Sequence, residues 1–276
     1  MKKIILICNG GDIANLMTFA FSLVEASKLK LLGMFPEVIQ FDEMPVRARV
    51  LQLATAGLDA DIDAVDILQD DISRNIDLFA SICEEEAIHK SVFRGLRPTI
   101  EEIAAESRFA DYIIMDAIPR KGYVIDLFHE RIVKELLPSV ECPVIIAPSS
   151  FTGLNEVMFW YEGNTSSAFA MKQFTYLGLL ADDIRTTILT TSQMGNTRQN
   201  DLQKMREWQC HHFDFNNIQT VDDRYDKGLF DFILRKNKTM LITGAHFRGR
   251  LLRFFQFSRS VLSIKTLPFP LFITNH

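Results

Sequence analysis

The chain has 276 residues, a length that suits two compact domains because a single hydrophobic core rarely grows so large. Apolar residues make up 47% and charged residues 24% of the sequence, which is typical of folded globular proteins and excludes wholesale disorder. The net charge of -5 gives no general attraction to nucleic acid or to an anionic membrane surface. We therefore expect neither as a partner.

Targeting signals are not evident. The apolar run after Met1-Lys2-Lys3 is broken at Asn9 to Asp12, too early for a signal peptide. No stretch approaches the roughly 18 apolar residues of a membrane span. The four cysteines show neither CxxC nor zinc-finger spacing, which indicates free thiols. These features predict a cytoplasmic protein.

The first part of the chain alternates strand and helix patterns. Residues 3–8 form an apolar run typical of a strand buried on both faces, and apolar spacing predicts a helix over 13–24. Thr99 and Glu102 have capping-box spacing, which predicts a helix start there. The other expected elements are a strand at 29–35, a helix around 72–83, a strand at 89–93, a strand at 112–115, a helix over 132–137 and a strand at 143–147.

The same order starts again in the second part. We expect strands at 157–161, 186–191, 240–243 and 271–274, with helical patterns at 168–180 and near 229–233. The sequence thus predicts two α/β domains, residues 1–150 and 151–276, each an open, mostly parallel five-stranded sheet of Rossmann-like type with helices on both faces. Pro, Ser, Thr and Gly cluster at the boundary, near 149–153. The extra length of the first part is expected between 36 and 71.

Short motifs recur in the two parts. The first strands end in Asn9-Gly10-Gly11 and Glu162-Gly163-Asn164, and the last strands follow Cys142-Pro143 and Phe269-Pro270. The strands at 112–115 and 240–243 precede Asp116 and Gly244. In this order the motifs resemble the universal stress protein family, in its tandem two-domain form.

The resemblance implies a nucleotide site, and the second domain keeps more of it. In family members that hold ATP, late glycines let the backbone approach the phosphates. Gly244 stands at the first of these glycines, whereas Phe247 and Phe257 replace the other two. The candidate nucleotide-binding residues of this domain are Glu162, Gly163, Asn164, Gly244, His246, Arg248, Arg250 and Ser258. ATP with magnesium is the candidate cofactor.

The first domain retains less of the pattern. Asp116 replaces the first late glycine and is expected to repel a phosphate, Pro119 replaces the second, and Glu130-Arg131 stand at the third. Asn9, Gly10 and Gly11 remain as a weak candidate site.

Three other features have competing interpretations. Arg248 and Arg250 could clamp a phosphate, or residues 245–253 could be a solvated basic loop leading into a helix. The acidic segment 59–70 resembles a calcium loop, but Ala64 stands where that loop needs glycine, so an exposed connection is favoured. His211 and His212, taken as neighbours on a strand, would point to opposite faces, which argues against a shared metal ion.

No GxSxG, GxxxxGK(S/T) or GxGxxG motif is present, and no acid is evident to orient His246 toward Ser258. We therefore expect a regulatory or stress-response protein and not an enzyme. One alternative is an interaction protein that binds protein partners and no nucleotide; the other is a hydrolase or transferase. Because family dimers pair their last strands, the strands at 143–147 and 271–274 are expected to form an internal pseudo-dimer, with a further homodimer left open.

Overall fold

The computed structural model describes residues 2–9, 11–25, 28–36, 62–95, 98–116, 129–179, 184–191, 198–213, 216–221, 227–236, 238–262 and 267–275. At 62–71, 191, 198–199, 216, 227 and 257–262 it describes the backbone alone.

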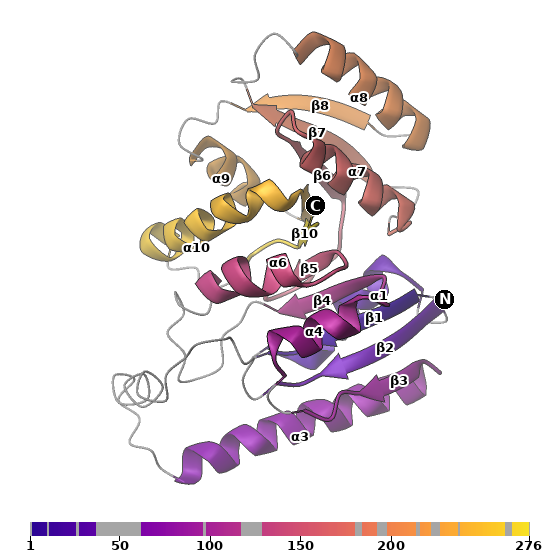
Figure 1. Ribbon diagram of the computed structural model, residues 1–276, viewed down its shortest axis with the longest axis vertical. Helices are drawn as coiled ribbons and strands as arrows, with labels where there is room; N and C mark the ends of the chain where they lie inside the picture. The colour runs from indigo at the N-terminus through magenta and orange to yellow at the C-terminus, as the bar shows by residue number, and fades with distance from the viewer. Residues whose placement is uncertain are drawn as a thin grey trace.

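The first half alternates strands and helices (Figure 1). Its strands are β1 (Lys2–Ile7), β2 (Leu29–Met34), β3 (His89–Val92), β4 (Tyr112–Asp116) and β5 (Val144–Ala147). Its helices are α1 (Ile13–Leu23), α3 (Ile62–Glu85), α4 (Ile100–Ser107), the π-helical turn η2 (Ile132–Leu136) and α6 (Leu137–Ser139).

The second half follows the same plan. Its strands are β6 (Glu156–Tyr161), β7 (Arg185–Thr191), β8 (Asn216–Val221), β9 (Thr239–Thr243) and β10 (Leu271–Ile273). Its helices are α7 (Thr165–Tyr176), α8 (Arg198–His212), α9 (Lys227–Leu234), the short turn η4 (Ala245–Phe247) and α10 (Arg248–Leu262).

All these strands belong to one ten-stranded sheet, in the order β3-β2-β1-β4-β5-β10-β9-β6-β7-β8. Within each half every neighbouring pair is parallel, and the one antiparallel pair among the described strands, β5 with β10, joins the halves. Reading outward from this junction, the two halves have the same strand order. The fold class predicted from the sequence, a mostly parallel sheet with helices on both faces, is confirmed, and the two five-stranded sheets are continuous.

The register of the central pair is symmetric. Pro143 directly precedes β5 and Pro270 directly precedes β10. Counted from those prolines, Ile145 and Phe272 hold the same position, and they face each other across the junction. An internal two-fold relation between the halves therefore passes through this pair.

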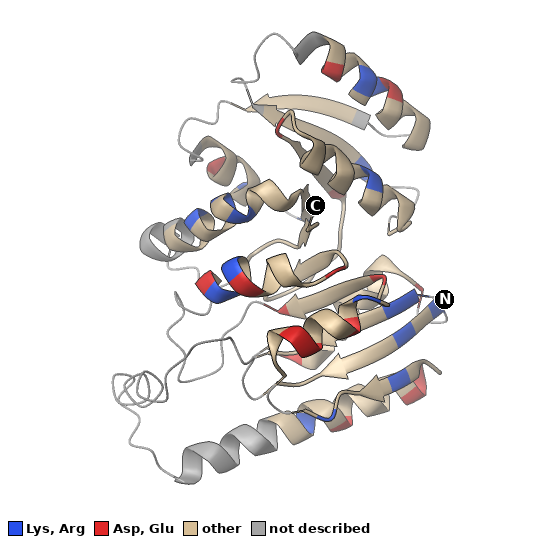
Figure 2. Cartoon of the chain, in the orientation of Figure 1, with Lys and Arg blue, Asp and Glu red and all other residues tan. Residues whose placement is uncertain are grey.

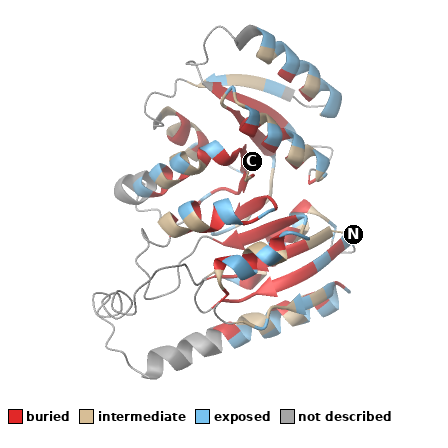
Figure 3. Ribbon diagram, in the orientation of Figure 1, coloured by how far each residue is buried: buried red, intermediate tan, exposed pale blue. Residues whose placement is uncertain are grey.

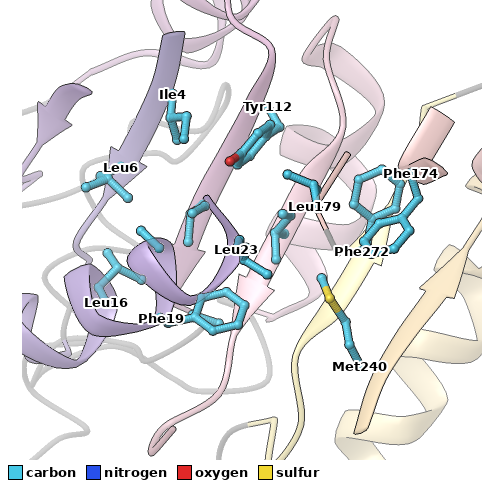
Figure 4. Packing of buried hydrophobic residues seen from close by; sticks show 14 of the residues in the cluster. Ile4, Leu6, Leu16, Phe19, Leu23, Tyr112, Phe174, Leu179, Met240 and Phe272 are labelled. Atoms are coloured by element: carbon cyan, nitrogen blue, oxygen red, sulfur yellow. The ribbon is translucent and has the colours of Figure 1, made fainter. Parts of the chain in front are cut away.

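Two hydrophobic clusters cover the two faces of the sheet. Because neighbouring strand residues point to opposite faces, Ile5 belongs to one cluster and Ile4 to the other. Each cluster contains buried residues of both halves. Figure 3 shows the central strands buried, and the edge strands β3 and β8 and the outer faces of the helices more exposed. In Figure 4, Tyr112 of the first half lies in the same layer as Phe174 and Phe272 of the second. The hydrophobic core is thus not divided between the halves.

Polar side chains define several helix starts. Asp12 accepts a hydrogen bond from the Ala14 amide at the start of α1, and Asn164 accepts one from Ser167 at the start of α7. Thr99 and Glu102 form the capping box that their spacing predicts.

Residues 148–155, which connect β5 to β6, are tied to α1. Asn15 donates a hydrogen bond to the Pro148 carbonyl at 3.1 Å and accepts one from the Phe151 amide at 3.1 Å. The Phe151 ring packs edge-on against Phe19, with centroids 5.0 Å apart. This connection is therefore held against the first half. The boundary expected between residues 150 and 151 stays a prediction.

Two segments differ from the sequence-based expectation. Helix α3 begins at Ile62, so residues 62–70, expected in an exposed acidic connection, are helical; residues 59–61 lie outside the described residues. Residues 198–212 form α8, and not the strand assumed for His211 and His212. That segment is rich in Gln, Lys, Arg and Glu, which favour a helix, but it lacks a clear apolar periodicity. No described helix is long and apolar enough to cross a membrane.

Candidate functional site

The candidate residues of the second half gather where β6 and β9 end. These strands are parallel neighbours, so their carboxyl ends lie at the same edge of the sheet. Glu162, Gly163 and Asn164 form the turn from β6 into α7. Gly163 has a φ of 76°, in the left-handed region that favours glycine, and Asn164 caps α7. The structure thus brings the first-strand turn and Gly244 to one edge.

Gly244 is packed tightly against the first turn of α7. A Cβ atom at this position would lie 2.3 Å from Ser166 Oγ and 2.5 Å from the Ser166 carbonyl carbon and oxygen. Because two of these atoms are backbone, they cannot move aside as a flexible side chain can. Glycine is therefore required here for helix-to-strand packing, a reason that sequence reasoning missed.

Glu162 and Arg250 form an ion pair across this edge. Arg250 Nε lies 3.2 Å from Glu162 Oε1, and the side chains are only 23% and 14% exposed. The Arg250 guanidinium also lies over the Trp160 ring, 5.5 Å from its centroid. Arg250, a candidate for clamping a phosphate, is thus already held by a carboxylate.

The second oxygen of Glu162 is in a different situation. Glu162 Oε2 is buried and has no hydrogen-bond partner among the described residues, and the same holds for Trp160 Nε1. Buried polar atoms are normally satisfied, and an ordered water or a bound molecule supplies the bond when the protein does not. This edge therefore has one unmet acceptor and one unmet donor beside the same guanidinium.

The remaining candidates lie around the start of α10. Gly244 is the N-cap of η4, where no side chain caps the backbone amides. His246 is exposed and Arg248 is half-buried. Figure 2 shows basic residues along α10. Ser258 belongs to α10 by its backbone, but its side chain lies outside the described residues, as does that of Phe257.

The first half has a different arrangement at the equivalent edge. Asp116, at the end of β4, is 5% exposed, and its Oδ2 accepts hydrogen bonds from the Asn9 amide at 2.9 Å and the Gly11 amide at 3.3 Å. The carboxylate expected to repel a phosphate thus binds the backbone of the candidate site itself. Gly10 and Pro119 lie outside the described residues.

Metal-ligand clusters are absent from the part of the chain that the structure describes: no three His, Cys, Asp or Glu residues are grouped to hold an ion. His211 and His212 lie in the last turn of α8, with ring centroids 5.8 Å apart and nearly perpendicular planes. Their placement on a strand was wrong, because α8 extends to His212.

Trp160 and Ser166 are the neighbours of the site that the sequence did not single out. Trp160 lies two residues before Glu162, and such alternate residues share one face of a strand. That spacing could have indicated their proximity. The contact between Gly244 and Ser166 has no local sequence signal, because the two residues come from different segments of the chain.

No family model matches the chain, and no curated protein sequence matches it significantly. Among solved structures, a universal stress protein from Archaeoglobus fulgidus DSM 4304 superposes with a TM-score of 0.60 over 100% of this chain and 96% of that chain. This chain shares its fold. At 14% sequence identity the likeness concerns the fold alone.

A second solved structure covers almost as much of the chain but fits less well. It is the cytoplasmic domain of a prokaryotic cation chloride cotransporter, with a TM-score of 0.44 and 11% identity over 99% of this chain and 95% of that one.

Proposed function

We propose that the protein is a cytoplasmic regulatory protein of the universal stress type that binds one adenine nucleotide at the edge formed by β6 and β9. The observation that carries this proposal is the buried Oε2 of Glu162, which has no hydrogen-bond partner in the part of the chain that the structure describes. An acceptor in that position calls for a donor from a ligand, such as a ribose hydroxyl or a base amino group. Its other oxygen is bound to Arg250, so the carboxylate is oriented in advance.

The phosphates of such a nucleotide would lie toward the start of α10. The half-buried Arg248 supplies donors there, no side chain caps the start of η4, and the dipole of α10 favours negative charge. Arg250 is bound to Glu162 through Nε, so it could reach a phosphate only with its other guanidinium N–H groups. Magnesium, the other half of the candidate cofactor, would then be held by the phosphates, since no described acidic cluster lies there to hold it.

A second candidate function is binding of protein partners without a nucleotide. Two observations favour it: Glu162 neutralises Arg250, and the Glu162 amide is already bonded to Ser167 Oγ at 3.3 Å. In this case the edge formed by β6 and β9 binds no nucleotide and only stabilises the fold.

Titration calorimetry with magnesium and ATP distinguishes these two functions. We expect one ATP per chain. Glu162→Ala should lower the affinity at least tenfold, because a ligand donor that loses its buried carboxylate acceptor costs about 1.4 kcal/mol or more. Arg253→Ala, at an exposed position on α10, is the control and should leave affinity unchanged. No heat and no thermal shift at millimolar ATP would leave partner binding as the function.

Tryptophan fluorescence provides an independent readout. The chain has two tryptophans, Trp160 and Trp208, so a Trp208→Phe variant reports on Trp160 alone. Since Arg250 covers the Trp160 ring, nucleotide binding should change its emission. GTP serves as the comparison for base selectivity. We expect no catalysis, so phosphate release should not exceed that of Ser258→Ala.

The same proposal makes one chain the minimal functional unit, an internal pseudo-dimer of two half-sheets. The symmetric pairing of β5 with β10 supports this, because it occupies the edge that each half would otherwise expose. Sedimentation equilibrium should therefore give the mass of one chain, 31.6 kDa. A mass of about twice that value would indicate the further homodimer.

A further inference from the structure

The two ends of the ten-stranded sheet are edge strands of different kinds. The sheet ends in β3 on one side and in β8 on the other, and each pairs with one neighbour among the described strands. The outward N–H and C=O groups of an edge strand can bind another strand. Folded proteins commonly prevent this with short edge strands, lysine or proline. By these criteria β3 and β8 differ.

β3 is the protected edge. It has four residues, and one of them is Lys90. The Lys90 ammonium donates hydrogen bonds to the Ala80 carbonyl at 2.8 Å and to Glu84 at 2.6 Å, so it is held beside the strand. A short strand with a charged residue at its second position is a poor template for another strand.

β8 has none of these protections. It is the six-residue strand Asn216–Val221, and its sequence contains no charged residue and no proline. Asn217 and Thr220 are exposed, and Ile218 is half-buried. Ile218 packs in the same hydrophobic cluster as residues of α8, and Val221 packs in the same cluster as residues of α9. The two helices therefore pack on opposite faces of β8.

Side chains that bond to β8 show which of its backbone groups point away from the sheet. The Gln219 carbonyl accepts a hydrogen bond from Thr190 Oγ1 of β7 at 3.3 Å. The Gln209 side chain bridges the Asn217 carbonyl, at 3.2 Å, and the start of β7. These two carbonyls therefore point toward β7. Because backbone groups alternate in direction along a strand, those of Ile218, between them, point outward.

We propose that β8 is a docking edge for a second copy of this chain, and that the two β8 strands pair antiparallel about a two-fold axis at Ile218. In this register the outward groups of Ile218 bond those of the same residue in the partner subunit. Asn217 then faces Gln219 of the partner subunit. Their side-chain amides both donate and accept hydrogen bonds, so the strand is complementary to its own copy and brings no like charges together.

The rest of the structure fits a second copy at this edge. The chain already contains one junction of this type, because β5 and β10 pair antiparallel in a symmetric register. The sequence of α8 carries both signs of charge, as Figure 2 shows, so two copies should not repel each other there. This inference does not depend on nucleotide binding at Glu162.

The dimer should be weak. One pair of short strands buries little area compared with the roughly 1,200 to 2,000 Å² of stable interfaces, so we expect a Kd on the order of 100 μM. At low micromolar concentration the protein should therefore have the mass of one chain, as the internal pseudo-dimer requires.

Sedimentation equilibrium over roughly 5 to 500 μM protein tests the proposal. The average mass of the wild type should rise from that of one chain toward twice that value. Asn217→Lys combined with Gln219→Lys brings like charges face to face in the proposed register and should raise the Kd at least tenfold. Asn217→Lys combined with Gln219→Glu brings opposite charges together, so it should associate at least as tightly as the wild type at low salt and more weakly at high salt.

The control for added charge is Ser91→Lys, which changes the edge strand β3 and should leave the Kd unchanged. The proposal is overturned if the wild type keeps the mass of one chain at about 500 μM, or if the variant with two lysines associates as the wild type does. A variant with lysine and glutamate that associates as weakly as the one with two lysines would refute the antiparallel register.

Hydrogen exchange of the wild type provides a measurement that needs no variant to fold. Peptides that contain residues 216–221 should exchange more slowly at high protein concentration than at low concentration, because their outward amides become paired. Peptides that contain residues 89–92 should not change. Equal exchange of β8 at both concentrations would also overturn the proposal.

Discussion

The ion pair between Glu162 and Arg250 should stabilise the fold more than its Nε–Oε1 distance of 3.2 Å suggests. We consider the volume-conserving variants Glu162→Gln and Arg250→Met, singly and together. Glu162→Gln removes the negative charge but keeps an amide oxygen, and Arg250→Met removes the guanidinium, at a site where the side chains are 14% and 23% exposed. The double variant removes the pair as a whole, so the cycle isolates its coupling energy.

The magnitude follows from burial. Exposed ion pairs contribute about 0.2 to 1 kcal/mol, whereas breaking a fully buried pair costs about 3 to 5 kcal/mol. With partial solvent screening, we expect Arg250→Met to destabilise the protein by about 2 kcal/mol. Loss of the guanidinium over Trp160 adds about 0.5 kcal/mol to that value. The coupling energy of the pair should be about 1.5 kcal/mol.

The assay is urea unfolding followed by tryptophan fluorescence and by circular dichroism. Arg108 and Glu141 are the matched comparison: their atoms are closer, at 2.7 Å, but the side chains are 56% and 49% exposed. We expect a coupling energy below about 0.5 kcal/mol for Arg108→Met with Glu141→Gln. If the coupling energy of Glu162 and Arg250 is no larger than that of Arg108 and Glu141, burial does not set the strength of these ion pairs.

Three further predictions follow from the core. The Tyr112 hydroxyl is buried without a partner among the described residues, so Tyr112→Phe should leave stability unchanged or raise it by about 1 kcal/mol in urea unfolding; a loss above that would indicate a hidden hydrogen bond. Burial raises the pKa of Cys83 to about 11 and that of Cys142 to about 12, from an ordinary value of 9.0. The free energy of unfolding should therefore fall as the pH rises from about 9 to 12, because the unfolded chain loses these protons first. In native protein at pH 8 a thiol reagent should modify the exposed Cys210 first, and rapid reaction of Cys142 would contradict its burial. Phe272 is fully buried at the junction, so Phe272→Ala should destabilise the protein by about 3 to 5 kcal/mol while unfolding remains a single transition by two probes; two separate transitions would mean that the halves unfold independently.

Much of the fold was predictable because local periodicity reflects burial. The run at 4–7 is apolar at every position because β1 lies inside the sheet with helices on both faces. The segment at 216–221 escaped prediction for the opposite reason. It forms β8, an edge strand with one neighbour, and its polar residues do not resemble a buried strand.

The site was predictable only in part. The resemblance grouped Glu162 and Gly244 in one candidate nucleotide site, and the structure shows that they follow neighbouring parallel strands. It did not predict that Arg250 is bound to Glu162, or that Gly244 is required by Ser166. These contacts join segments that are distant along the chain, and no local pattern encodes them.

Asp116 illustrates the difference between the two kinds of information. From its residue type alone, a carboxylate at a strand end predicts repulsion of phosphate. In the structure the same carboxylate accepts hydrogen bonds from the Asn9 and Gly11 amides. The sign of its effect on the turn thus depends on which donors face it.

The sequence by itself determined the order of most strands and helices, their alternation and the repetition of one plan, because each depends on spacing within a short segment. The tertiary structure alone decided that β5 pairs with β10 in a symmetric register, and that both hydrophobic clusters run through the junction. It also decided how each half fills its first turn. Such outcomes depend on which distant surfaces meet, and the free energy of burial and hydrogen bonding that selects them is a property of the whole fold.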